Sequence, residues 1–213
     1  MIDALRVLAF VVIVRPLVCG VLGLNRQGRE WLPERGPAVV VANHNSHLDT
    51  LVVMCLFRLA RLCDVRPVGA RDYFTKSRWL EWLATRLLGV IPLERSCRPS
   101  GGDPLAACDR ALADGQVLIV FPEGTRGEPE KIAPFRPGVA HLARRHPEVP
   151  FVPVWLEGCG KAMPRGSRIP IPFVCDVRIG EPTRWTGDRD AFIAELERRV
   201  LALRRHRSLR PRL

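Results

Sequence analysis

The sequence predicts an α/β fold of one domain: a mostly parallel, mixed sheet flanked by helices, with a short membrane-associating helix at the N-terminus. Short β-branched runs alternate with helical patterns along the chain, and 213 residues suit one domain of ordinary size. A hydrophobic fraction of 47% is enough for a buried core and excludes wholesale disorder. We divide the chain into an apolar segment (1–27), the main domain (28–205) and a basic tail (206–213).

Residues 4–24 form an apolar segment that Arg6, Arg15 and Pro16 interrupt. The longest uninterrupted apolar stretch covers residues 7–14, whereas a helix that crosses a bilayer needs about 20 apolar residues. We therefore expect a helix, bent or broken at Pro16, that lies on or shallowly in a membrane with both arginines reaching for lipid headgroups. The alternative is a helix docked on the core of the domain.

The remaining elements follow from apolar patterning. Short runs rich in β-branched residues predict strands at 38–42, 65–70, 90–93, 116–121, 151–156 and 173–179. Apolar positions at helical spacing predict helices at 46–60, 77–88, 104–113, 137–145 and 189–205. The 77–88 helix carries Trp79 and Trp82, which suit either the core or a headgroup boundary. In a parallel sheet, sites form beyond the carboxyl ends of strands, here after Ala42 and after Phe121.

The motif Asn-His-Asn-Ser-His-Leu-Asp at 43–49 follows the first of these strands. On one helix His44 and Asp49 would point about 140° apart, but they can pair if His44 lies in the loop and Asp49 in the first helical turn. The carboxylate would then hold the imidazole as a base for a hydroxyl proton, and backbone amides near Ser46 are the expected oxyanion donors. Alternatively, Ser46 and Asp49 form only a capping box beside an incidental His44.

The motif Phe-Pro-Glu-Gly-Thr-Arg at 121–126 follows the 116–121 strand. Pro and Gly turn the chain and let backbone amides approach a ligand. Arg126 offers a planar fork that suits a phosphate, and Lys131 and Arg136 add positive charge nearby. Glu123 would orient Arg126 or hold a substrate hydroxyl, and Arg95 lies beyond the end of the 90–93 strand. The alternative is a surface turn with solvated charges.

Composition limits the partners. Lys and Arg number 33 against 22 Asp and Glu, a net charge of +11 that implies an anionic partner. The arginines are scattered and no helix-turn-helix or RNP-like pattern occurs, which argues against nucleic acid. Seven cysteines with no CxxC spacing argue against disulfides and structural zinc and favour a reduced, cytosolic setting. His44, His47 and Asp49 are possible metal ligands without a second ligand set, so we expect no metal.

Together these motifs resemble the 1-acylglycerol-3-phosphate acyltransferase family of glycerolipid acyltransferases. Residues 43–49 are similar to its NHxSxxD block, and 89–95 (GVIPLER), 121–126 (FPEGTR) and 152–154 (VPV) to its later blocks, in the same order. The resemblance implies a glycerol-3-phosphate acyltransferase-like fold, with His44 as general base and Asp49 as its orienting partner. It also implies substrate-binding residues, with the acceptor phosphate on the arginines and the acyl donor near the proline: Arg95, Glu123, Gly124, Thr125, Arg126, Lys131 and Pro153.

The implied reaction moves a fatty acyl group from acyl-CoA or acyl carrier protein to the free hydroxyl of 1-acylglycerol-3-phosphate, making phosphatidate. It implies no cofactor, and it places the protein at the cytoplasmic face of the cell membrane, peripheral or monotopic, on an anionic lipid surface. The alternative acceptors are a lyso-amino-acid lipid or a glycolipid, and the departures from the family pattern at Asn45, Pro92 and Glu94 bear on this choice. The absence of a GxSxG motif argues against a hydrolase, and the paired His44 and Asp49 argue against an inactive lipid-binding or scaffold protein.

Overall fold

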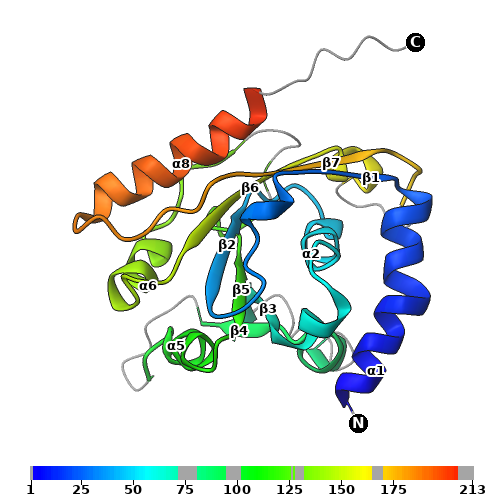
Figure 1. The fold of residues 1–213 in the computed structure, drawn as a ribbon, viewed down its shortest axis with the longest axis horizontal. Coiled ribbons are helices and arrows are strands. Elements are labelled where there is room, and N and C mark those ends of the chain that lie inside the picture. The colour runs from blue at the N-terminus through cyan, green and yellow to red at the C-terminus, as the bar shows by residue number, and fades with distance from the viewer. Residues whose placement is uncertain are drawn as a thin grey trace.

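The computed structural model describes residues 2–71, 81–94, 102–125, 127, 132–164 and 170–205. Within these residues the strands form one seven-stranded sheet in the order β1-β7-β6-β2-β5-β3-β4 (Figure 1). β6 and β7 run antiparallel, and the other described neighbours run parallel. The predicted mostly parallel, mixed sheet is confirmed. Its strands are β1 Leu24–Gln27, β2 Ala38–Ala42, β3 Val65–Ala70, β4 Ile91–Leu93, β5 Val117–Val120, β6 Phe151–Glu157 and β7 Cys175–Ile179.

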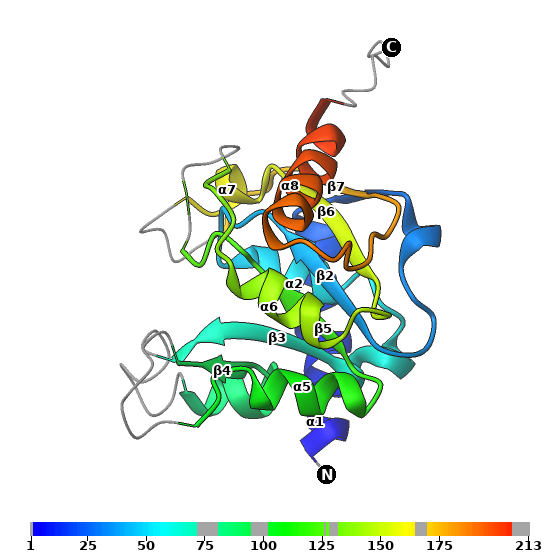
Figure 2. The same cartoon turned by 90° about the vertical axis from the view of Figure 1, so that its left-hand side faces the viewer.

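Helices cover both faces of the sheet. The helices of regular α-form are α1 Ile2–Ala9, α2 Leu48–Met54, α5 Ala106–Ala113, α6 Gly138–Arg145, α7 Cys159–Ala162 and α8 Arg189–Arg205. Wider turns form η1 Phe10–Val14, η2 Pro16–Val21 and η5 Leu83–Leu87, and tighter turns form η3 Arg29–Trp31 and η4 Leu59–Asp64. Figure 2 shows α5, α6 and α8 in front of the sheet, whereas α1 and α2 lie behind it.

The central strand explains the two layers. All five residues of β2 are buried, because the strand is covered on both faces. Val40 packs in the core beneath α2 and the N-terminal helix, and Val39 and Val41 pack beneath α5, α6 and α8. Because side chains alternate along a strand, β2 contributes residues to two separate cores, one on each face of the sheet.

The N-terminal helix differs from expectation. It is continuous over Asp3–Val21 and is long and apolar enough to cross a membrane by length and composition. Pro16 does not break it, because the missing N–H falls where the helix has changed to wider π-type turns. The helix is therefore not broken at Pro16, and the apolar helix extends beyond residues 7–14.

The two arginines of this helix bind the domain instead of reaching for lipid headgroups. The buried Arg6 guanidinium donates from Nη2 to the carbonyl oxygens of Val65 (2.6 Å) and Leu88 (2.9 Å). Arg15 donates from Nη2 to the carbonyl oxygen of Phe57 at 2.7 Å. These bonds satisfy carbonyls at the ends of neighbouring elements and fix the helix against the domain.

The helix has two apolar faces with different surroundings. Phe10, Val14 and Val18 pack in the core. Leu8, Val12 and Ile13 point the other way and are 58%, 61% and 63% exposed. The expected docking on the core therefore describes one face of the helix. The other face remains available to a membrane, as the membrane-surface expectation requires.

Other predicted elements differ at their ends. The 46–60 helix is shorter, because α2 ends at Met54 and η4 begins at Leu59. β1, Leu24–Gln27, is a polar edge strand without a hydrophobic run and was not predicted. Of the 77–88 helix, residues 81–88 are described, with Trp82 exposed and Ala84 buried. Trp79 and the basic tail, 206–213, lie outside the described residues.

Candidate active site

His44 lies in the loop that follows β2, and Asp49 lies in the first turn of α2. Nδ1 of His44 is 3.0 Å from Oδ2 of Asp49. The loop-plus-helix geometry predicted for this pair is confirmed. The two side chains can meet because a loop separates the end of β2 at Ala42 from the start of α2 at Leu48. On one continuous helix they would point about 140° apart.

The Asp49 carboxylate also organises the loop. Its side chain is fully buried, and Oδ2 accepts hydrogen bonds from the backbone N–H groups of Asn45 (2.5 Å) and Ser46 (2.7 Å). An ionised carboxylate only accepts, so the neutral imidazole that pairs with it carries its proton on Nδ1 and has its lone pair on Nε2. One oxygen atom, Oδ2 of Asp49, therefore both pairs with His44 and bonds the backbone at the start of α2.

The His44 imidazole is held on a second side by Phe121. The two rings stack with centroids 4.2 Å apart and an interplanar angle of 21°. The side chain of His44 remains 20% exposed, so one edge of the ring can reach a substrate. Phe121 follows β5 directly, and its contact joins the two motifs predicted to meet at the same end of the sheet.

Glu123 braces the loop that carries His44. Oε1 accepts the backbone N–H of His44 at 2.8 Å, and Oε2 accepts the backbone N–H of Ala133 at 2.9 Å. Burial raises the pKa of Glu123, while these amide bonds oppose the shift. The backbone N–H of Gly127 also donates to the carbonyl oxygen of His44 at 3.1 Å, so the two loops are bonded in both directions.

Asn43 positions the His44 loop, a role that the sequence analysis did not assign to it. Its Nδ2 donates to the carbonyl oxygen of Leu156 at 2.9 Å, and its Oδ1 accepts the N–H of Leu156 at 2.7 Å. The buried amide thereby extends the pairing of β2 and β6 by one residue and ties the His44 loop to β6. The available signal was an asparagine directly after an apolar strand, because its amide can donate and accept like a peptide group.

The backbone amides expected to stabilise the oxyanion are already bonded. Those of Asn45 and Ser46 donate to Asp49, and that of Leu48 donates to Oγ of Ser46 at 3.3 Å. The hydroxyl of Ser46 in turn donates to the carbonyl oxygen of Met163 at 3.1 Å. The loop uses these three amides to hold its own shape, and an oxyanion role for amides near Ser46 stays a prediction.

Gly124 and Arg136 meet beside the His44 loop. Gly124 has φ +72°, and a Cβ there would lie 2.6 Å from Nε of Arg136, which donates to the carbonyl oxygen of Glu123 at 3.1 Å. Glycine therefore permits the guanidinium to pack over this turn. Thr125 is exposed on the same turn.

The structure does not test the roles of the other predicted substrate-binding residues. Pro153 is buried inside β6 opposite Val41, near Gly180, and its role beside the acyl donor stays a prediction. Arg95, Arg126 and Lys131 lie outside the described residues, so their roles stay predictions too.

A thioester on Cys159 is disfavoured beside this site, whereas the hydrogen bond with Cys159 lowers the pKa of the buried Cys175 thiol. Hydrogen bonding to the Cys175 sulfur and burial raise the pKa of the Cys159 thiol, and the nearby Asp49 charge acts in the same direction. A thiol held neutral is a poor nucleophile. Among the residues that the structure describes, no group of three or more His, Cys, Asp and Glu side chains could hold a metal ion.

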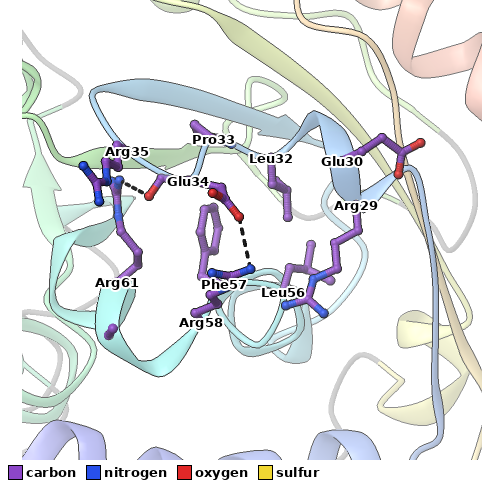
Figure 3. A pocket seen from close by; sticks show the side chains of 11 residues that line it. Arg29, Glu30, Leu32, Pro33, Glu34, Arg35, Leu56, Phe57, Arg58 and Arg61 are labelled. Atoms are coloured by element: carbon purple, nitrogen blue, oxygen red, sulfur yellow. Dashed lines mark hydrogen bonds and ion pairs between the residues drawn. The ribbon is translucent and has the colours of Figure 1, made fainter.

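A cavity of about 590 Å³ lies at the opposite end of β2 from His44 (Figure 3). Leu32, Leu56 and Phe57 form its apolar part, and the exposed Arg58 and Glu34 at its rim pair at 3.1 Å. Its lining contains no residue of the loops that carry His44 and Glu123.

Comparisons with known proteins agree on one family. A family model described as Acyltransferase matches residues 23–157. The chloroplastic 1-acyl-sn-glycerol-3-phosphate acyltransferase BAT2 of Brassica napus is 35% identical over 142 residues, 66% of this chain and 39% of that protein. The 1-acyl-sn-glycerol-3-phosphate acyltransferase alpha of Bos taurus is 30% identical over 175 residues, 82% of this chain and 58% of that protein.

Two further matches bear on acceptor and fold. The lyso-ornithine lipid O-acyltransferase of Rhizobium meliloti is 32% identical over 116 residues, 54% of this chain and 37% of that protein. The crystal structure of the 1-acyl-sn-glycerophosphate acyltransferase PlsC from Thermotoga maritima has a TM-score of 0.70 at 23% identity, covering 95% of this chain and 77% of that one. That likeness shows a shared fold. The chain spans from 37% to 58% of the lengths of these three curated relatives.

Proposed function

The chain belongs to the acyltransferase family, and from this premise we propose that it acylates the free hydroxyl of 1-acylglycerol-3-phosphate to make phosphatidate. The acyl donor is acyl-CoA or acyl carrier protein. The observation that carries the proposal is the contact between Nδ1 of His44 and Oδ2 of Asp49, with the His44 side chain still 20% exposed. The names of the relatives from Brassica napus and Bos taurus support the choice of acceptor.

The reaction needs one base and no covalent enzyme intermediate. Nε2 of His44 removes the proton of the acceptor hydroxyl as its oxygen attacks the thioester carbonyl. The tetrahedral intermediate expels the thiolate of the donor, which takes the proton back from the imidazolium. Asp49 keeps the ring oriented and stabilises its positive charge while the proton is held. Neither a cofactor nor a metal takes part.

The acceptor phosphate needs cations near His44. Arg136 is exposed and bonded to the turn that carries Glu123, so its remaining guanidinium N–H groups can meet a phosphate. Arg95, Arg126 and Lys131 complete the proposed phosphate site, as the family resemblance implies. Glu123 serves it indirectly by holding the two loops together.

The membrane supplies the acceptor, and the N-terminal helix supports attachment to it. Its outer face exposes Leu8, Val12 and Ile13, while its inner face is packed on the domain and tied down by Arg6. A helix of this kind can lie in the interface with its outer face among the acyl chains. We place the protein at the cytoplasmic face, where anionic lipid attracts a chain of net charge +11.

A lyso-amino-acid lipid is the second candidate acceptor. The likeness to a lyso-ornithine lipid O-acyltransferase favours it. Such an acceptor has no phosphate, so substitution of Arg136 by alanine distinguishes the two candidates. The variant would lose activity on 1-acylglycerol-3-phosphate and retain it on lyso-ornithine lipid if both were substrates.

The test is acyl transfer by the purified chain from labelled acyl-CoA, and separately from acyl carrier protein, to a panel of lyso-lipids. We expect 1-acylglycerol-3-phosphate to give the highest rate. A higher rate on lyso-ornithine lipid would establish the second candidate, and no transfer to any acceptor from either donor would remove the proposal.

A further inference from the structure

Residues 170–174 form an exposed apolar segment that the assigned site does not use. Ile171, Phe173 and Val174 are 58%, 42% and 57% exposed. Large apolar side chains gathered in five residues at the surface indicate an interaction site, whereas scattered single ones do not. We call this stretch the 170–174 segment.

The backbone of the 170–174 segment suits a lipid interface. Pro170 and Pro172 have no N–H group, and the N–H of Ile171 donates to the carbonyl oxygen of Ala162 at 2.7 Å. An N–H group without a partner is costly away from water, so a segment with few free donors can insert more easily. Pro170, Ile171 and Pro172 therefore have no unsatisfied N–H group.

One end of the segment is bonded to the catalytic loop through α7. Ala162, which accepts the bond from Ile171, is followed by Met163, whose carbonyl oxygen accepts the Ser46 hydroxyl at 3.1 Å. Ser46 shares the Asp49 carboxylate with His44. A surface that contacts the 170–174 segment thus lies beside the loop that carries the base.

The other end of the segment meets the N-terminal helix. The N–H of Cys175 donates to the carbonyl oxygen of Gly23 at 2.9 Å, and a Cβ at Gly23 would lie 3.7 Å from Cγ2 of Val174. Val21, at the end of that helix, is 52% exposed. The C-terminal end of this apolar helix therefore lies beside the 170–174 segment.

We propose that the 170–174 segment is a second membrane contact, which inserts Ile171, Phe173 and Val174 into the interface of an anionic bilayer next to the His44 loop. The position beside the end of the apolar N-terminal helix favours lipid as the occupant. Charge agrees, since Nζ of Lys161 lies 5.6 Å from the centroid of the Phe173 ring, where an ammonium can meet lipid headgroups. The inference deepens the proposed function and rests on it for the identity of the acceptor.

The test compares the wild type with the double variant Ile171→Ser/Phe173→Ser and a control, Trp31→Ser, which removes an exposed apolar side chain at the other end of β2. Partition is measured by sedimentation with vesicles of phosphatidylcholine and phosphatidylglycerol, and unfolding temperatures verify the fold. We expect the double variant to partition about tenfold less well, because two apolar side chains leave the interface, and the control to match the wild type. Unchanged partition of the double variant would overturn the proposal.

Activity separates the other outcomes. We expect the double variant to lose rate on a long-chain acceptor in vesicles and to keep it on a dispersed short-chain acceptor. Equal loss on both acceptors at unchanged partition, or a loss confined to acyl carrier protein as donor, would assign the segment to substrate or donor binding and overturn the membrane contact. Normal vesicle binding by a wild type that acylates no acceptor would remove the proposed function and leave the membrane contact standing.

Discussion

Nδ1 of His44 and Oδ2 of Asp49 lie 3.0 Å apart across a turn from strand to helix. The same carboxylate oxygen accepts two backbone N–H groups of the loop between them. The orientation of the base and the shape of its loop therefore both depend on one buried atom. This arrangement predicts that changes at Asp49 affect both activity and stability.

Asp49→Asn should lower kcat by about 10²- to 10⁴-fold with a smaller effect on KM, because the amide no longer holds one tautomer of His44. It should also cost about 1–3 kcal/mol of unfolding free energy, since buried amides lose part of their acceptor. Steady-state kinetics and urea unfolding measure the two effects. The control is Asp114→Asn at an exposed position, and wild-type kcat in Asp49→Asn would contradict the orienting role.

Glu123→Gln should change how stability depends on pH. Burial raises the pKa of Glu123 above its ordinary value of 4.5, so the folded state keeps a proton that the unfolded state has lost. That contribution is fully present below the unfolded pKa and is lost as the pH rises through the folded pKa. The stability advantage of wild type over Glu123→Gln should therefore shrink from about pH 4 upward in urea unfolding. An advantage that grows with pH, or an equal change in the exposed control Glu30→Gln, would contradict this cause.

Gly158→Ala should destabilise the fold. Gly158 has φ +89°, and a Cβ there would lie 2.3 Å from the carbonyl oxygen of Val174. A left-handed alanine alone costs about 1–2 kcal/mol, and the close contact adds to it. The matched control is Gly138→Ala, where no atom lies within 4 Å of the new Cβ and the helix should gain about 0.4–1 kcal/mol. Thermal unfolding should shift in opposite directions, and a shift in the same direction would refute the steric argument.

Arg6→Met should loosen the N-terminal helix. The carbonyl oxygens of Val65 and Leu88 lose their buried donor, at a cost of about 1–3 kcal/mol. Hydrogen exchange should become faster in residues 3–21 than in the central strands. Leu8→Met, on the exposed face, is the control and should leave exchange unchanged. Wild-type exchange in Arg6→Met would show that the apolar face alone holds the helix.

The sequence was most informative where local patterning and tertiary structure agree. The run Ala38–Ala42 was predicted with its observed bounds, because a strand buried on both faces is apolar throughout. The His44–Asp49 contact was predictable because the two residues are only 5 positions apart in the sequence. The neighbouring motif that carries Glu123 was placed at the same end of the sheet by the rule for parallel strands.

Contacts between distant segments were not predictable in the same way. Arg6 bonds to Val65 and Leu88, which are 59 and 82 residues away in the sequence. The apolar residues around Arg6 gave no sign of these partners and suggested a side chain that faces lipid. The role of Asn43 depends on Leu156, which is 113 residues away and reaches the loop only through sheet pairing. β1 has no apolar pattern because it is a polar edge strand, held by its pairing with β7.

The central claim is that His44 is the general base of an acyl transfer. The most direct measurement is the rate at which purified His44→Ala transfers a labelled acyl group to 1-acylglycerol-3-phosphate, beside wild type and the exposed control His141→Ala. We predict a fall of about 10²- to 10⁴-fold for His44→Ala and a wild-type rate for His141→Ala. A folded His44→Ala variant that transfers the acyl group at the wild-type rate would contradict the account.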